Sequence, residues 1–325
     1  MTDETLDSSL PAEANQSKPL PPRREATPWT IAFVTVLTAL IGFTLIGPFI
    51  GLMIAYPMYD GEPMDFITDV GNPVGKEYMR SLMMIVQGAS TLIGLAVVPT
   101  LFWMQLKRKK VTTLFTDTPL NPMYLWLAAG TIIFFIGLDS VIIEWNSNLD
   151  LPDGAFETFA KDLKERTGTF VKWLVAFPNA GHYVIGVIVI AILPAIGEEL
   201  VFRGFLQPEL QKSFKNPHIG IWVAAILFSA LHMQFYGFFP RIFLGALMGY
   251  MYYWSKNMWV PILAHFVNNM IAVTMLYVSL KHMPELNFDD TEAMPWYIVI
   301  SSGAIFVALL YRFYSLRKTA DDVRS

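Results

Sequence analysis

Long uncharged runs, separated by short polar segments, make up most of the chain. A helix that crosses a bilayer needs about 20 mostly apolar residues, and several runs reach or approach this length. The pattern predicts eight membrane-spanning helices, at about 29–56, 81–104, 121–143, 181–207, 219–236, 240–255, 259–280 and 295–314. The expected fold is therefore all-α, a polytopic membrane helix bundle, in which the fifth and sixth runs carry the weakest signal.

The composition agrees with a membrane protein and excludes several other classes. The 325 residues are 54% hydrophobic and 15% charged, whereas soluble domains carry roughly 25% charged residues. The chain has no cysteine, which excludes disulfides, thiolate zinc sites and cysteine nucleophiles. A net charge of −4 provides no basic field for nucleic acid. The expected partners are therefore membrane lipid and a peptide or protein, with no nucleic acid.

The positions of lysine and arginine predict the orientation, because positively charged loops stay in the cytoplasm. If the eight runs alternate in direction, all the basic clusters fall on one side of the membrane and the acidic loops fall on the other. The basic residues are Arg23, Arg24, Lys107, Arg108, Lys109, Lys110, Lys212, Lys215, Lys256, Arg312, Arg317 and Lys318. Both termini are thus expected in the cytoplasm, and we expect a multi-pass protein of a bacterial plasma membrane.

The same pattern divides the chain into four parts. Residues 1–28 are proline-rich and polar, which predicts a disordered leader. Residues 29–180 hold three runs and an amphipathic extracytoplasmic segment, residues 181–280 hold four runs, and residues 281–325 hold the last loop, the last run and a cytoplasmic tail. The amphipathic segment, roughly 154–177, is expected to form a helix that either lies on the membrane surface or packs on the rim of the bundle.

Three charged residues interrupt the fourth run. Each ionised residue near the centre of a spanning helix costs about 2.5–3.5 kcal/mol, so such residues usually face a protein or water-filled interior. Glu199 and Arg203 are four residues apart, which favours an ion pair on one helix face. Glu198 points roughly 100° away from Glu199. It therefore needs a partner from another helix or a proton.

Candidate partners occur in two later runs. His232 follows Phe228 by one helical turn, and His265 precedes Asn269 by one turn. A lone intramembrane histidine or asparagine is more often a packing residue, but several unpaired polar groups together favour one cluster with Glu198. Depths counted at ~1.5 Å per residue disagree with that cluster. They place Glu198 and His232 about 15–21 Å and His265 about 9 Å from the predicted helix ends.

These residues fall in three motifs that resemble, in order, the signatures of the CPBP family. This family comprises the CAAX proteases and bacteriocin-processing enzymes, also called the Abi family of intramembrane proteases. The motifs are Glu198-Glu199-Leu-Val-Phe-Arg203, Phe228-Ser-Ala-Leu-His232 and His265-Phe-Val-Asn-Asn269. The resemblance covers residues 181–280 and implies a helical bundle whose site opens between helices, with peptide-bond hydrolysis as its reaction. Residues 181–280 are then the catalytic core of an intramembrane endopeptidase.

The resemblance implies a division of roles within the cluster. Glu198 is the expected general base for water, with His232 orienting the water or sharing its proton, and His265 and Asn269 are the expected donors to the oxyanion. The two histidines could exchange these roles. The supporting residues are Glu199, Arg203 and Phe228. This favoured mechanism needs no cofactor.

A divalent metal such as zinc is the competing mechanism. Glu198, His232 and His265 would be a suitable three-ligand set for catalytic zinc, although the sequence has no H-E-x-x-H helix. The substrate would be a membrane-associated protein or peptide, with or without a lipid modification. Two other functions remain open: a non-catalytic scaffold or immunity protein of the same fold, and a proton-coupled transporter. The transporter has less support because the chain shows no inverted pair of broken helices.

Overall fold

The computed structural model describes residues 26–283 and 291–324, and all the regular secondary structure in these ranges is helical. The all-α prediction is thus confirmed. The predicted leader, apart from its last residues, and most of the last polar loop lie outside the described residues. The α-helices are α1 Pro28–Ile41, α2 Gly47–Ala55, α3 Pro63–Gly71, α4 Glu77–Ala89, α5 Val98–Lys107, α6 Thr113–Thr116, α7 Pro122–Ser147, α8 Ala155–Val175, α9 Ala180–Gly186, α10 Leu193–Glu199, α11 Gln207–Phe214, α12 Pro217–Ala230, α13 Phe238–Ser255, α14 Trp259–His282 and α15 Trp296–Arg324.

Six helices of the described chain are long and apolar enough to cross a membrane. Three of them are composites of shorter elements that continue one another without a break. The six are Pro28–Met58, Glu77–Lys107, Pro122–Ser147, Ala180–Phe214, Trp259–His282 and Trp296–Arg317. We call Ala180–Phe214, which joins α9, α10 and α11, the long helix. The chain is therefore built as an integral membrane protein with about six spanning helices.

Two of the eight predicted spans are not among these six. The run 219–236 contains α12, which has 14 residues, and at ~1.5 Å per residue it is shorter than the ~30 Å hydrocarbon core. The helix ends because the chain turns after it, with Met233 at φ 57°. The run 240–255 corresponds to α13, which has 18 residues. Hydrophobic content predicted helices in both runs, but it did not reveal that a turn carrying His232 shortens the first.

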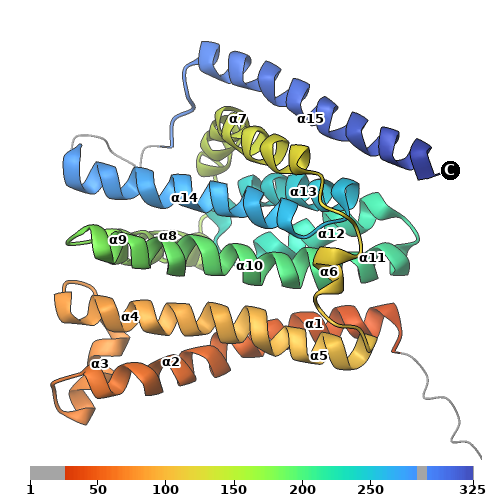
Figure 1. Cartoon of the computed structure of the whole chain (residues 1–325). Helices are drawn as coiled ribbons and strands as arrows, with labels where there is room; N and C mark the ends of the chain where they lie inside the picture. The colour runs from red at the N-terminus through yellow and green to blue at the C-terminus, as the bar shows by residue number, and fades with distance from the viewer. Residues whose placement is uncertain (1–25, 284–290, 325) are drawn as a thin grey trace, which may run out of the picture.

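The long helix lies between two groups of helices (Figure 1). On one side are the pairs α1–α2 and α4–α5. On the other are α14, α12 and α13, followed by α7, with α15 packed on α7 at the edge of the molecule. The axes of most helices run in nearly the same direction across the picture. The long helix therefore contacts both groups, which places its polar residues inside the bundle.

Four π-helical stretches interrupt the composite helices, and each ends two residues before a proline. The stretches and prolines are 42–46 with Pro48, 90–97 with Pro99, 187–192 with Pro194, and 200–206 with Pro208. A proline has no N–H, and its ring collides with the carbonyl four residues earlier. Widening the helix to a π-turn removes this collision without ending the helix. Two of these stretches flank α10, which ends with Glu198 and Glu199.

Glycines allow the first two composite helices to touch through their backbones. A Cβ atom built on Gly42 would lie 2.4 Å from the Gly94 carbonyl oxygen, and one on Gly47 would lie 2.5 Å from the Ser90 Cα. Close backbone contact between small residues is typical of helix association in membranes, where dispersion replaces the hydrophobic effect. These contacts fix how α1–α2 and α4–α5 cross beside the long helix.

Helix ends carry clear local signals. Thr27, Asn121 and Asn216 each cap a helix through a side-chain oxygen that accepts from a backbone N–H, and each is followed by proline at the first helical position. Arg108 and Lys256 adopt left-handed conformations just after α5 and α13. Basic residues near these ends complement the helix dipole. Both ends, together with the start of α1 and the end of α15, lie at one end of the molecule (Figure 1).

The predicted amphipathic helix is α8. At its end, Trp173, Leu174 and Val175 are buried in a cluster with residues of α4 and α14, whereas Phe156 and Phe159 near its start are exposed. Arg80 of α4 donates to the Trp173 carbonyl at 3.0 Å. Packing on the rim of the bundle, one of the two predicted placements, therefore applies to the second half of α8.

Candidate functional site

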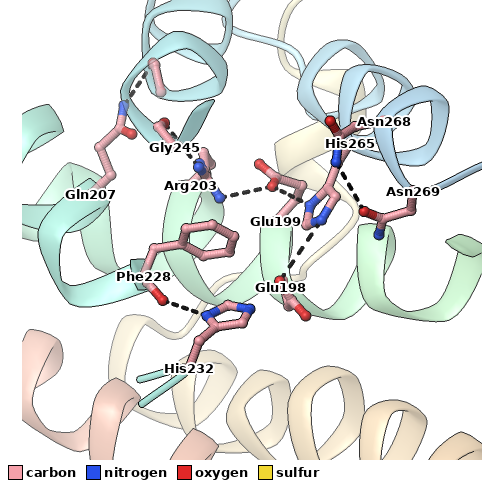
Figure 2. A network of polar contacts seen from close by, with 11 residues as sticks. Glu198, Glu199, Arg203, Gln207, Phe228, His232, Gly245, His265, Asn268 and Asn269 are labelled. Carbon is pink, nitrogen blue, oxygen red and sulfur yellow. Dashed lines mark hydrogen bonds and ion pairs between the residues drawn. The ribbon is translucent and has the colours of Figure 1, made fainter. Parts of the chain in front are cut away.

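The long helix carries the twin glutamates near its middle, between the two π-helical stretches (Figure 2). Glu199 and Arg203 form the predicted ion pair, with 2.7 Å between Nη1 and Oε1, and their side chains are 0% and 2% exposed. Glu198 points away from this pair, as its neighbouring position requires, and its side chain is 16% exposed. The two acids therefore have different surroundings, one fully enclosed and one in contact with open space.

Glu199 and Arg203 together connect three helices. Glu199 Oε1 accepts from Arg203 and lies 2.8 Å from His265 Nδ1 on α14. Arg203 also donates from Nη2 to the Gly245 carbonyl of α13 at 2.9 Å. The guanidinium lies over the Phe228 ring, 4.9 Å from its centroid. A buried charge pair is stable only when such additional bonds satisfy both groups. The second oxygen of Glu199, Oε2, has no hydrogen-bond partner among the described residues.

The bond to Glu199 fixes the orientation of His265. Since a carboxylate only accepts hydrogen bonds, Nδ1 is the protonated nitrogen that donates to it. Nε2 then faces Glu198, with 3.8 Å between Nε2 and Oε2. This separation is too long for a hydrogen bond. Two acceptor atoms, His265 Nε2 and Glu198 Oε2, are therefore directed at the same small space, where one water could donate to both.

His232 lies in the turn just after α12, not within the helix as the sequence predicted. Its Nδ1 lies 2.8 Å from the Phe228 carbonyl oxygen, so Nδ1 is the donor and Nε2 is free to accept. Figure 2 shows Nε2 directed toward Glu198. No hydrogen bond joins these two side chains within the described structure. The ring of Phe228 packs edge-on against both His232 and His265, at centroid distances of 5.0 and 6.0 Å.

Asn269 lies one turn beyond His265 on α14, on the same side as predicted. Its Oδ1 accepts from the Asn268 side chain at 3.3 Å, which leaves the Asn269 amide N–H groups free of that bond. Figure 2 shows this nitrogen turned away from Asn268. The Asn269 amide thus accepts from Asn268 through Oδ1 and keeps its N–H groups as donors for another partner.

The structure removes the depth mismatch between His265 and the glutamates. At ~1.5 Å per residue, His265 lies about 9 Å from the start of α14, whereas the long helix continues about 24 Å beyond Glu198 to Phe214. The start of α14 and the end of the long helix at Phe214 thus lie at different levels along the bundle. The sequence count was wrong because it treated these ends as one plane.

Two residues packed next to the ion pair, Gln207 and Gly249, were given no role by the sequence interpretation. Gln207, one turn after Arg203, is buried and donates to the Gly249 carbonyl at 3.1 Å. A Cβ atom on Gly249 would lie 2.9 Å from the Gln207 side-chain oxygen. The signal was present in the spacing, because Arg203 and Gln207 repeat at the same interval as Gly245 and Gly249. Small residues on α13 expose carbonyls that hold the polar face of the long helix.

The residues present do not form a ready metal site. No three His, Asp or Glu side chains among the described residues are grouped closely enough to hold an ion. Glu198 and His265 present one atom each to the shared space, but the third proposed zinc ligand, His232, does not complete a set with them. The zinc ligand set of Glu198, His232 and His265 therefore stays a prediction from the sequence, and no step below depends on it.

An apolar groove lies beside the polar cluster that Glu198, Glu199, Arg203, His232 and His265 form. It has a volume of about 430 Å³ and is lined by residues of the long helix and α14, among them Ala195 and Ile262. Ala195 is one turn before Glu199, and Ile262 is one turn before His265 on its flank. The groove is therefore close to the polar cluster and suited to an apolar chain.

Comparisons with known proteins agree with the motifs. The sequence profile of the family described as Rce1-like, type II CAAX prenyl endopeptidase, matches residues 180–271. The uncharacterized protein YpbD of Bacillus subtilis (strain 168) is 32% identical to the chain over 108 residues, which are 32% of this chain and 51% of that protein. The chain thus matches about half the length of this relative. No solved structure is significantly similar to the chain.

Proposed function

Because residues 180–271 form a domain of the Rce1-like type II CAAX prenyl endopeptidase family, we propose that the protein is an intramembrane endopeptidase with Glu198 as its general base. The observation that carries this proposal is the position of Glu198. It is the one acid of the pair that is not enclosed, and it faces unprotonated nitrogens of two histidines. That arrangement suits the activation of a water molecule for hydrolysis.

The proposed reaction forms no covalent bond between the protein and its substrate. Glu198 removes a proton from water as the water oxygen bonds to the peptide carbonyl carbon. The second O–H of the water donates a hydrogen bond to His232 Nε2, which orients the water and leaves this hydrogen on its oxygen. The carbonyl oxygen becomes an oxyanion, and the Asn269 amide donates to it. Glu198 then returns the proton to the leaving nitrogen as the C–N bond breaks. One product ends in a carboxyl group and the other begins with an amine.

His265 and Asn269 contribute from α14. Asn269 provides a neutral N–H donor to the oxyanion, and His265 directs its unprotonated Nε2 at the same space as Glu198. Removal of one such donor costs about 10²–10³ in kcat in a comparable site. Glu199 and Arg203 hold His265 in place and do not contact the substrate. Phe228 packs edge-on against both histidine rings, which helps to keep each ring in its orientation.

The substrate is proposed to be a membrane-associated protein or peptide. The apolar groove beside the polar cluster would take a lipid chain or an apolar segment of such a substrate. The positive-inside rule supports a cytoplasmic location for the end that carries Arg108, Lys215 and Lys256. A bacterial relative supports a bacterial plasma membrane as the site of action.

The test compares the termini of membrane proteins in cells that express the natural protein or the Glu198→Gln variant. Glutamine keeps the volume of the side chain but cannot act as a base. We expect the Glu198→Gln protein to insert into the membrane at the normal level. The protein termini that are seen only in cells with the natural protein should disappear. Glu62→Gln, an exposed position in the loop before α3, is the matched control. A scaffold or immunity protein would keep its biological effect in the Glu198→Gln variant, and that result would reject the proposal.

A further inference from the structure

A second pocket adjoins the cluster on the side of α8. It has a volume of about 280 Å³ and lies between α8 and the turn that follows His232. Two cationic residues line it, Lys164 of α8 and Arg241 of α13, and no Asp or Glu of the described chain does. Gln234 and Thr167 add neutral polar groups. The pocket therefore favours an anion.

Arg241 is only partly satisfied by the protein. It donates from Nη1 to the Gln234 carbonyl at 3.3 Å and from Nη2 to the Gln234 side-chain oxygen. A guanidinium has five N–H donors, and these two bonds are its only hydrogen bonds to described residues. The group is pressed against the backbone at Gly237, where a Cβ atom would lie 2.7 Å from Nη2. A partly buried arginine with no carboxylate in hydrogen-bond contact is costly unless a ligand completes it.

The pocket is close to the reacting atoms. Gln234 is two residues from His232, and Arg241 is near enough to Glu198 for their charges to interact. Lys164 lies over the Tyr236 ring, with 5.0 Å between Nζ and the ring centroid, on the opposite wall of the pocket. Both cations are thus held by the turn that also carries His232. An anion bound there would lie next to a peptide held at Glu198.

We propose that Arg241 and Lys164 form a carboxylate-binding subsite that selects peptides with a negative charge near the bond to be cleaved. The inference rests on the proposed function, because it assigns the pocket to the substrate of the same site. The flat fork of a guanidinium matches a carboxylate in a bidentate pair. In a peptide, the carboxylate comes either from the free C-terminus or from an Asp or Glu side chain.

Binding to the inactive protein tests the subsite without relying on cleavage. The Glu198→Gln protein, in phosphatidylcholine nanodiscs, is titrated with fluorescent N-myristoylated peptides in three forms. The forms are a free C-terminal acid, the corresponding amide, and the amide with one internal Asp. We expect the acid form, the Asp form or both to bind about 10- to 100-fold tighter than the neutral amide. The preferred form identifies the source of the carboxylate.

Three further variants separate recognition from a structural role. Arg241→Gln should remove the preference for the charged peptides and leave binding of the neutral amide unchanged, and Arg241→Lys should restore part of the preference. Lys164→Gln, which breaks no hydrogen bond in the described structure, should reduce the preference by up to about 5-fold. Arg166→Gln is the matched control, because Arg166 is exposed on the same helix and pairs with Asp162. It should change nothing.

Several outcomes would overturn the inference. Equal binding of charged and neutral peptides would do so, as would a preference that survives both Arg241→Gln and Lys164→Gln. A loss of all binding in equal proportion would show that Arg241 only holds the turn after His232. If phosphatidylglycerol removes the preference, the pocket takes a lipid phosphate instead, which also overturns it. The proposed function fails separately, through continued cleavage by the Glu198→Gln protein.

Discussion

At the level of single residues, Glu198 and Glu199 differ in what each carboxylate touches. Glu199 is enclosed and accepts from Arg203 and His265, whereas Glu198 borders open space. The sequence predicted the bond between Glu199 and Arg203, because that pair depends only on helical spacing. It grouped His265 with Glu198, His232 and Asn269 and not with Glu199. The bond from His265 to Glu199 depends on how α14 is rotated against the long helix, which no local pattern contains.

The buried pair should matter far more for stability than an exposed pair with the same spacing. Arg203→Met leaves Glu199 as an uncompensated buried charge, which should cost about 3–5 kcal/mol of unfolding free energy. Lys161→Met removes the equivalent cation from the exposed Glu157–Lys161 pair and should cost at most about 1 kcal/mol. Thermal or denaturant unfolding in detergent measures both. Equal losses in the two variants would contradict the assignment of Glu199 and Arg203 as a structural pair.

Among the helices, prolines and glycines decide features that hydrophobic patterns do not predict. Hydrophobic runs located all six spanning helices, because length and apolar content determine them. They did not predict the π-helical stretches, each of which ends two residues before a proline. Each stretch rotates the residues after it about the helix axis, relative to a regular α-helix. The helices toward which Glu198 and Arg203 point could therefore not be predicted from a regular helical repeat.

The contact between the first two composite helices gives a test at the level of elements. Gly42→Ala places a Cβ atom 2.4 Å from the Gly94 carbonyl oxygen, and backbone cannot move aside as a side chain can. We expect a destabilisation of about 1–3 kcal/mol. Gly88→Ala is the control, because its nearest neighbour would be a Val189 methyl at 3.6 Å. Alanine is the better helix former, so Gly88→Ala should be neutral or stabilising, and an equal loss in both variants would contradict the close crossing.

The loop between the first two composite helices should be sensitive to acid. Lys76, Tyr59 and Tyr78 all donate to Asp69, and mainly the bond from Lys76 lowers the pKa of Asp69 from 3.8 to about 2. A pKa that is lower in the folded state adds stability above pH 3.8, and this stability is lost as the pH falls toward 2. The protection of residues 59–78 against hydrogen exchange, measured relative to the intrinsic rate at each pH, should therefore fall over this interval. Asp69→Asn should exchange faster at neutral pH and show no such acid transition, and a wild-type acid transition that persists in Asp69→Asn would contradict the account.

At the scale of the whole molecule, the long helix brings the separate observations together. It contacts the first two composite helices on one side and α12, α13 and α14 on the other. Motifs far apart in the sequence therefore meet at its middle. The order and spacing of the motifs predicted which helices would meet. The location of His232 in a turn, and the two pockets beside the cluster, depend on packing between helices and could only come from the structure.

Turnover by the purified protein is the most direct measurement of the central claim. The full-length protein in nanodiscs is assayed on a peptide that spans a cleavage site. The site is one whose new terminus in cells depends on Glu198. The proposed reaction predicts that Glu198→Gln lowers kcat by at least about 10², the lower range for loss of a general base. It also predicts that chelation of divalent metal leaves wild-type turnover unchanged. Wild-type rates in the Glu198→Gln protein, with normal folding, would contradict the claim that this carboxylate activates the water.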